Sequence, residues 1–167
     1  WFVPFRRPAE FATDSAKMID VVLHALDWYR DCKNADTKFA MLLQPTSPFR
    51  GGSCLAEAVA LLETNANIDC VVGMRNINLP PTNFYQNTSD GTAVPIGTSD
   101  LSPVLVPNGA LYLARVKALR AERTVYTKKL WALIFDQLRS IDIDTPSDWS
   151  LAESVIEKNL LGGKYNV

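Results

Sequence analysis

The chain has 167 residues, of which 47% are hydrophobic and 21% are charged. These proportions are typical of a globular protein and exclude a disordered chain. The 17 basic and 18 acidic residues give a net charge of −1, which argues against a protein that binds nucleic acid or an anionic membrane surface. No apolar run approaches the roughly 20 residues that span a bilayer, so no membrane segment is expected.

The cysteine pattern favours a reducing compartment. Cys32, Cys54 and Cys70 are odd in number and show no CxxC spacing, which predicts neither a metal knuckle nor a disulfide framework. The expected location is therefore a reducing cytoplasm. The chain opens at Trp1 without an initiator methionine or a signal-peptide pattern, so we expect that its beginning is missing here. The length fits a single domain over residues 1–167.

The first half of the chain alternates apolar runs with segments of helical periodicity. A helix is expected over roughly 17–31, with Asp14 or Ser15 as its N-cap, and a second helix from Gly51 onward. One face of the first helix is apolar and consists of Ile19, Val22, Leu23, Leu26 and Tyr29. Residues 1–5 are expected to form a short strand or an extended entry. A strand buried on both faces is expected at 39–43, and another buried strand at 68–74. The interior of the sheet should contain Leu42, Leu43, Val71, Val72 and Leu111.

Residues 75–107 break this alternation, because prolines recur there among Asn, Thr, Ser and Gly. We expect an irregular excursion or a hairpin, since a connection of this length is usually functional or an oligomer contact. Regular structure then resumes with a strand at 109–113, a short helix at 117–122 and a strand within 130–135. Helices alternating with apolar strands predict an α/β fold with a largely parallel sheet.

The last helix has a clear start signal. Thr145 can serve as N-cap, Pro146 occupies the first helical position and Asp148 the third. Its predicted apolar stripe consists of Trp149, Ala152, Ile156 and Leu160, and the glycine pair at 162–163 is expected to end it.

Asp142 and Asp144 are the first candidates for chemistry. In an extended segment, residues two apart project to the same face, and two carboxylates on one face suit a hard cation such as Mg²⁺. A solvated acidic turn before a capped helix explains the same spacing.

A polar loop follows the apolar run at 39–43. It offers the Gln44 amide, the hydroxyls of Thr46 and Ser47 and the planar guanidinium of Arg50, at the strand end where open α/β sheets bind ligands. Asn108, between Pro107 and Gly109, precedes the next strand and marks a tight approach of the backbone. For both segments an ordinary turn remains the alternative.

Four segments carry a likeness to a known family, in that family's order. They are residues 7–14 (RPAEFATD), 42–50 (LLQPTSPFR), 107–112 (PNGALY) and 140–145 (SIDIDT). With them the chain resembles the acylneuraminate cytidylyltransferases, also called CMP-sialic acid synthetases, from about residue 3 to residue 160. The variant Gln-Pro-Thr-Ser-Pro separates it from the related Kdo cytidylyltransferases.

The resemblance implies a Rossmann-like nucleotidyltransferase fold with three α/β/α layers and a mostly parallel sheet, usually dimeric. The family transfers CMP from CTP to a nine-carbon α-keto acid sugar of the sialic acid type and releases pyrophosphate. Mg²⁺ is the implied cofactor, since it offsets charge on the phosphates. The excursion at about 75–107 would meet the partner subunit of a homodimer.

The resemblance also assigns roles to residues. Asp142 and Asp144 are the implied catalytic carboxylates that bind the metal, and Arg7 is implied on the nucleotide side. Residues implied to line the sugar pocket are Gln44, Asn108 and Tyr112, with Val125 and Tyr126 against the N-acyl group.

Several positions depart from the family pattern. The family opens with a strand and a Gly/Ser/Lys-rich loop that cradles the triphosphate, and this chain begins downstream of both. Val106 stands where an arginine is common, and Met18 where a nucleotide-contacting Ser or Thr is expected. Basic residues expected in the excursion are replaced by Asn83 and the uncharged stretch 101–105. Each loss removes a charge-assisted contact worth up to ~3 kcal/mol, so weak or absent catalysis is expected.

Three hypotheses therefore remain. The chain is a cytidylyltransferase domain without its nucleotide loop, or an inactive truncated homologue that acts as a dimeric binding or structural module. The third is an active enzyme of altered specificity whose loop is left out of this sequence.

Overall fold

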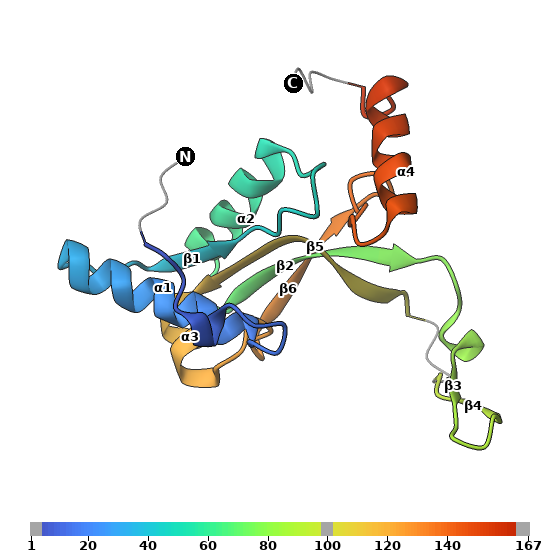
Figure 1. Cartoon of the computed structure of the whole chain (residues 1–167), viewed down its shortest axis with the longest axis horizontal. Coiled ribbons are helices and arrows are strands. Elements are labelled where there is room, and N and C mark those ends of the chain that lie inside the picture. The colour runs from blue at the N-terminus through green and yellow to red at the C-terminus, as the bar shows by residue number, and fades with distance from the viewer. Residues whose placement is uncertain (1–4, 98–101, 163–167) are drawn as a thin grey trace. The chain divides into compact units, whose positions relative to one another are not determined.

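The computed structural model describes residues 5–97 and 102–162, and the short strand or extended entry expected at 1–5 lies almost wholly outside them. Figure 1 shows the helices and strands, coloured along the chain. The chain forms two compact units. The first unit consists of 1–44, 51–72 and 111–132, and the second of 45–50, 73–110 and 133–167. Among the described residues, no helix is long and apolar enough to cross a membrane.

Four strands form the main sheet, in the order β1-β5-β2-β6. They are β1 (Phe39–Leu42), β2 (Cys70–Ile77), β5 (Val104–Arg115) and β6 (Leu130–Phe135). β1 and β5 are antiparallel, with Phe39 opposite Arg115. The Asp69 amide donates to the Lys129 carbonyl over 2.9 Å, so β2 and β6 begin side by side and are parallel.

The Arg115 amide donates to the Asp69 carbonyl over 2.9 Å, which places the end of β5 beside the start of β2. β5 therefore runs opposite to its neighbours, and β1, β2 and β6 share one direction. The α/β class is confirmed, with a mixed, mostly parallel sheet.

The helices are α1 (Met18–Lys33), α2 (Gly52–Thr64), α3 (Val116–Glu122) and α4 (Pro146–Glu157), which confirms the four expected from periodicity. The N-cap predicted for α1 is wrong. Lys17 occupies that position without a side-chain cap bond, because Ser15 lies in a preceding turn where its hydroxyl pairs with that of Thr13 at 3.2 Å.

The start of α4 is confirmed as a capping box. The Asp148 amide donates to the Thr145 hydroxyl over 3.3 Å, and the Thr145 amide donates back to the Asp148 carboxylate over 2.8 Å. The predicted apolar stripe is wrong in part, because Trp149, Ile156 and Leu160 are about half exposed. The buried residues of this helix are Ala152 and Val155, which pack with Phe49 and Ile141 in a small apolar cluster. The helix ends before the predicted glycine pair, at Glu157.

In the first unit, residues of β2 and β5 form part of the buried core. Val71, Val72 and Leu111 are fully buried, as predicted. The prediction that 39–43 is buried on both faces is wrong, since β1 and Leu43 are half-buried. Among the described strands, β1 lies at the edge of the sheet with β5 as its one neighbour, so no described strand covers its other side.

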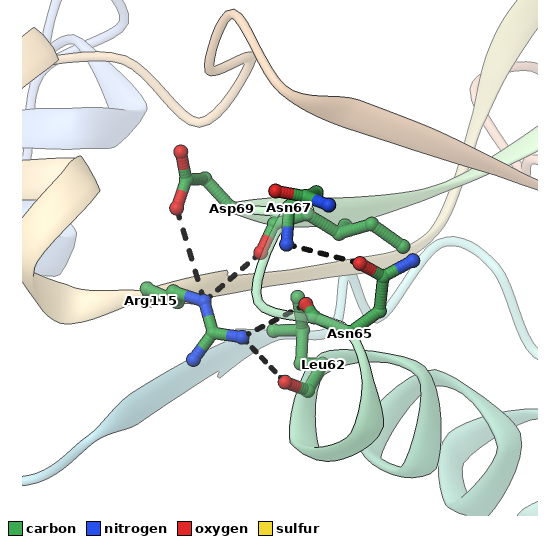
Figure 2. Close-up of polar contacts among 6 residues, drawn as sticks. Leu62, Asn65, Asn67, Asp69 and Arg115 are labelled. Atoms are coloured by element: carbon green, nitrogen blue, oxygen red, sulfur yellow. Dashed lines mark hydrogen bonds and ion pairs between the residues drawn. The ribbon is translucent and has the colours of Figure 1, made fainter.

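Arg115, at the end of β5, fastens the end of α2 to the start of β2 (Figure 2). Its guanidinium donates to the carbonyl oxygens of Leu62, Asn65 and Ile68 over 2.5, 3.1 and 2.9 Å. The Asp69 carboxylate lies 3.8 Å away. These carbonyls belong to the last turn of α2 and the loop after it, so the arginine satisfies acceptors that lack helical partners.

The sequence predicted either an irregular excursion or a hairpin at 75–107, and the structure contains a hairpin there. Its strands, β3 (Tyr85–Asn87) and β4 (Ala93–Pro95), pair antiparallel after a 3-10 turn, η2 (Pro81–Asn83). Gly91, with φ 86°, closes the turn between them. The side chains of Tyr85, Val94 and Ile96 are exposed by 60%, 44% and 58%.

Candidate functional site

The second unit contains a buried polar network at the loop that follows β1. Ser47 is fully buried, and its hydroxyl donates to the Asn108 carbonyl oxygen over 3.1 Å. The Asp142 carboxylate lies 3.4 Å from the same hydroxyl. Because a serine has one hydroxyl proton, the closer carbonyl and the carboxylate share a single donor. Ser47 therefore joins the loop, β5 and the segment that leads to α4.

Asn108 is held on both sides of its amide. Its Nδ2 donates to the Ser140 hydroxyl over 3.0 Å, and its Oδ1 accepts from the Ala110 amide over 3.2 Å. The next residue, Gly109, has φ 74°, a conformation that a residue with a Cβ rarely adopts. The prediction that Asn108 precedes the strand is wrong, because Pro107, Asn108 and Gly109 lie within β5, where the Asn108 side chain is only 4% exposed.

Asp142 and Asp144 lie in a segment outside the regular strands. The Ile143 amide donates to the Thr46 carbonyl over 2.8 Å, which ties this segment to the same loop. Ile141 is buried in the cluster under α4 and Ile143 packs against it, whereas the Asp142 carboxylate lies 3.4 Å from the Ser47 hydroxyl. Asp142 is half-buried and Asp144 is exposed. Among the described residues, no group of three or more His, Cys, Asp or Glu could hold a metal ion.

Arg50 closes the loop against β5. Its guanidinium donates to the Ala110 carbonyl over 3.3 Å, and burial lowers its pKa below the ordinary value. The planar group expected to meet a phosphate or carboxylate thus contacts the protein backbone.

In the first unit, Tyr112 and Tyr126 meet edge to face. Their ring centroids are 5.8 Å apart at 85°, and their hydroxyls are 3.5 Å apart. Tyr112 and Val125 are buried, whereas Tyr126 is exposed by 46%. Both buried residues line an apolar cavity of about 350 Å³, together with residues of α1 and all four residues of β1. Successive residues of a strand point to opposite faces, so this cavity opens along the edge of β1.

The structure groups the predicted site residues in two sets. Asn108 and Asp142 meet through Ser47 in the second unit, and Tyr112, Val125 and Tyr126 gather in the first. Gln44 lies half-buried just after β1, and Arg7 lies exposed before the 3-10 turn η1 (Ala9–Phe11). The buried hydroxyl of Ser140 was not singled out from the sequence, although it stands inside the motif at 140–145.

Comparison with known proteins places these motifs in a family. No protein-family model matches the chain. The CMP-N,N'-diacetyllegionaminic acid synthase of Legionella pneumophila is 32% identical over 167 residues, which cover 94% of this chain and 70% of that protein. The chain belongs to the acylneuraminate cytidylyltransferase family.

Longer members of the family align over the same region. The N-acylneuraminate cytidylyltransferase of Escherichia coli O18:K1:H7 is 33% identical over 159 residues, which cover 91% of this chain and 36% of that enzyme. An N-acylneuraminate cytidylyltransferase of Streptococcus agalactiae is 29% identical over 88% of this chain. The chain thus spans about a third of the length of these two relatives, which is 36% in each case.

Proposed function

We propose that this chain provides the cytidylyl-transfer site of an enzyme that acts on CTP and a nine-carbon sugar acid of the sialic or legionaminic type. The products would be the CMP-sugar and pyrophosphate. The observation that carries the proposal is the buried Ser47 hydroxyl, which holds the backbone of Asn108 and the Asp142 carboxylate together. Three of the family motifs thus converge on one point in a chain that is 32% identical to a CMP-legionaminic acid synthase.

Asp142 and Asp144 fit a hard divalent cation. The two aspartates alternate with Ile141 and Ile143, which pack into or against the cluster, and Mg²⁺ is commonly held by one or two carboxylates together with substrate phosphates. Asp142 is oriented by Ser47, while Asp144 is exposed. Bound there, Mg²⁺ would offset the negative charge of the triphosphate.

The remaining assignments follow the two sets of residues. Arg7 would contact the nucleotide, and Gln44 with Tyr112 would contact the sugar. Val125 and Tyr126 would face the N-acyl group. The place of Val125 in the apolar cavity and the ring contact of Tyr126 with Tyr112 support this assignment. Asn108 is held by Ser140 and the Ala110 amide, so its contribution would be to fix this part of β5 and to offer its remaining amide hydrogen.

The excursion at 75–107 is proposed as the contact of a homodimer within a single-domain protomer. Tyr85, Val94 and Ile96 expose apolar surface on a hairpin of two three-residue strands. A two-stranded hairpin has little stability of its own, and apolar side chains on it gain free energy when a partner covers them.

The open edge of β1 favours a second possibility for the chain taken alone. Its backbone pairs with β5 on one side, and the other side borders the apolar cavity of about 350 Å³. A family strand and its nucleotide loop would complete this edge. Without them, the chain would act as a dimeric binding or structural module rather than as an enzyme.

The test measures pyrophosphate release from CTP and N-acetylneuraminate in the presence of Mg²⁺. We expect no turnover from the present chain, and turnover after fusion of the N-terminal segment of the Escherichia coli relative. In the fused protein, Asp144→Ala should abolish release, whereas Asp36→Asn in the loop before β1 should not. If the fused protein folds but neither N-acetylneuraminate nor legionaminic acid supports release, the proposed function is wrong.

A further inference from the structure

In the first unit, the segment that precedes α1 contacts that helix through aromatic rings. The ring of Phe5 meets the imidazole of His24 edge to face, with centroids 5.2 Å apart at 81°. The ring of Phe11 lies on the same imidazole, with centroids 5.1 Å apart at 37°. Phe5 also contacts the indole of Trp28, with centroids 5.1 Å apart. All four rings are half-buried. Both ends of the segment 5–11 therefore rest on one side chain, that of His24.

His24 and Trp28 form a separate face of α1. They lie one helical turn apart, on the side of the helix away from the buried residues Ile19 and Leu23. Neither belongs to the apolar stripe that the sequence predicts for this helix. Aromatic rings with centroids 4.5–7 Å apart attract each other in addition to the gain from burial. This face of α1 therefore holds the aromatic side chains of the preceding segment.

The backbone of the segment makes local hydrogen bonds. The Phe11 amide donates to the Pro8 carbonyl over 3.0 Å, and the Ala12 amide donates to the Ala9 carbonyl over 3.1 Å, which together form the turn η1. These bonds shape the segment but do not attach it to α1. Its attachment to the helix therefore depends on the ring contacts with His24 and Trp28.

Arg7 lies between the two residues that contact His24. Its side chain is exposed, and within the described part of the chain its guanidinium makes no hydrogen bond or ion pair. The following residue, Pro8, restricts the backbone of Arg7 to extended conformations. A guanidinium presents two parallel N–H groups that match two phosphate oxygens. Arg7 thus offers a free charge on a backbone that is held on both sides.

We propose that His24 is a positioning residue, whose imidazole holds both ends of the segment 5–11 on α1 and thereby places Arg7 for contact with the nucleotide. This inference rests on the proposed function, in which Arg7 contacts the nucleotide, and adds the residue that positions it. The role requires an aromatic ring at position 24, because the contacts of that side chain with Phe5 and Phe11 are ring contacts. Phenylalanine should therefore replace His24, and alanine should not.

The first experiment measures NMR order parameters of backbone amides in the present chain without ligand. We expect the amides of Arg7 and Glu10 to be as ordered as those of α1. His24→Ala should lower their order parameters, and His24→Phe should preserve them. Trp28→Ala should lower them less, because Phe11 still rests on His24. Trp149→Ala, which removes an exposed ring from α4, should change neither.

Phe11→Ala removes one of these contacts from the side of the segment and leaves α1 intact. It should lower the order parameters of Arg7 and Glu10 in the same way, so the test does not depend on the folding of a helix variant. The proposal is overturned if His24→Ala and Phe11→Ala leave both amides as ordered as in wild type.

The second experiment measures pyrophosphate release by the fused protein. His24→Ala should raise KM for CTP about tenfold and change kcat little, because the lost ring contacts hold Arg7 throughout the reaction. His24→Phe should keep the wild-type KM. His24→Ala should have no further effect once Arg7 is replaced by alanine, because His24 acts through Arg7. A merely structural role would instead give effects that add in the double variant.

The two experiments distinguish failure of this inference from failure of the proposed function. Turnover with the same KM for CTP in wild type and His24→Ala, or additive effects with Arg7→Ala, would overturn the role of His24 and leave the function standing. If the fused protein folds but releases no pyrophosphate, the proposed transfer is wrong, and so is the placement of Arg7 for a nucleotide. The order parameters then still decide whether His24 holds the segment.

Discussion

The Ser47 hydroxyl and the backbone carbonyl of Asn108 are 3.1 Å apart, although 61 residues separate them in the sequence. Both residues are buried, and the Asp142 carboxylate is within 3.4 Å of the same hydroxyl. A serine that satisfies a strand carbonyl and orients a carboxylate couples the stability of the second unit to the geometry of the proposed metal site.

Substitution of Ser47 should therefore affect both folding and function. Ser47→Ala leaves the Asn108 carbonyl without its buried donor, so the free energy of unfolding should fall by about 1–3 kcal/mol. Urea denaturation measures the change, with Ser53→Ala on the exposed start of α2 as the matched control. If Ser47→Ala has the same midpoint of urea denaturation as wild type, the hydrogen bond contributes nothing to the free energy of unfolding.

Arg115 should be the most sensitive basic residue of the first unit. Arg115→Ala leaves the carbonyl oxygens of Leu62, Asn65 and Ile68 without their hydrogen-bond donor. The free energy of unfolding should therefore fall by about 2–3 kcal/mol. Arg115→Lys should restore only part of this, because an ammonium lacks the planar fork that spans these oxygens. Arg30→Ala on exposed α1 should change stability little. Equal midpoints for the Arg115 and Arg30 variants would contradict this account.

Local signals predicted the start of α4 but not its buried face. Thr145, Pro146 and Asp148 act within one turn, so the capping box follows from adjacent residues alone. The buried face depends on what packs beneath the helix. Phe49, from a distant part of the chain, and Ile141 pack there against Ala152 and Val155, and Trp149 is left exposed.

The edge position of β1 and the network around Ser47 both depend on contacts between residues that are far apart in the sequence. An apolar run identifies a strand, but its burial depends on the position of the strand in the sheet, which here places β1 at an edge. The motifs around Ser47, Asn108 and Asp142 could be recognised one by one. Their meeting through a single hydroxyl is a contact across the chain, and no local pattern encodes it.

The turn of the excursion hairpin should depend on pH through Asp90. Hydrogen bonds from the Thr88 hydroxyl and from Thr92 lower the pKa of Asp90 from 3.8 to about 2. Because the folded value is depressed, the stabilisation is present above pH 3.8 and is lost as the pH falls toward 2. NMR titration of the Asp90 carboxyl should show a rise toward the ordinary value in Thr88→Val, and no change in Thr64→Val on α2. A wild-type value near 3.8 would refute it.

The same hairpin should control assembly. We expect sedimentation velocity to show a dimer at micromolar concentrations, and a monomer when Tyr85, Val94 and Ile96 are all changed to serine. Loss of their apolar surface removes the gain from burial between protomers. Trp149→Ser, which removes an equally exposed apolar side chain from α4, should remain dimeric. A wild-type monomer at every concentration would rule out the proposed interface.

Metal binding should depend on the nucleotide. Asp142 and Asp144 supply two carboxylates, and the described residues add no further His, Cys, Asp or Glu to make a group of three. Mg²⁺ prefers six oxygen ligands, so the missing ones must come from water and from phosphates. Calorimetry should therefore detect weak binding of Mg²⁺ alone, and tighter binding of Mg²⁺ with CTP in the fused protein.

Substitution of the exposed aspartate isolates this effect. Asp144→Asn should remove the difference that CTP makes to Mg²⁺ affinity, while Asp36→Asn should preserve it, because the loop before β1 supplies no ligand to the proposed site. Circular dichroism of each variant controls for folding. Micromolar binding of Mg²⁺ to the present chain without nucleotide would mean that a complete set of ligands exists, and that the assignment of Asp142 and Asp144 as a partial site is wrong.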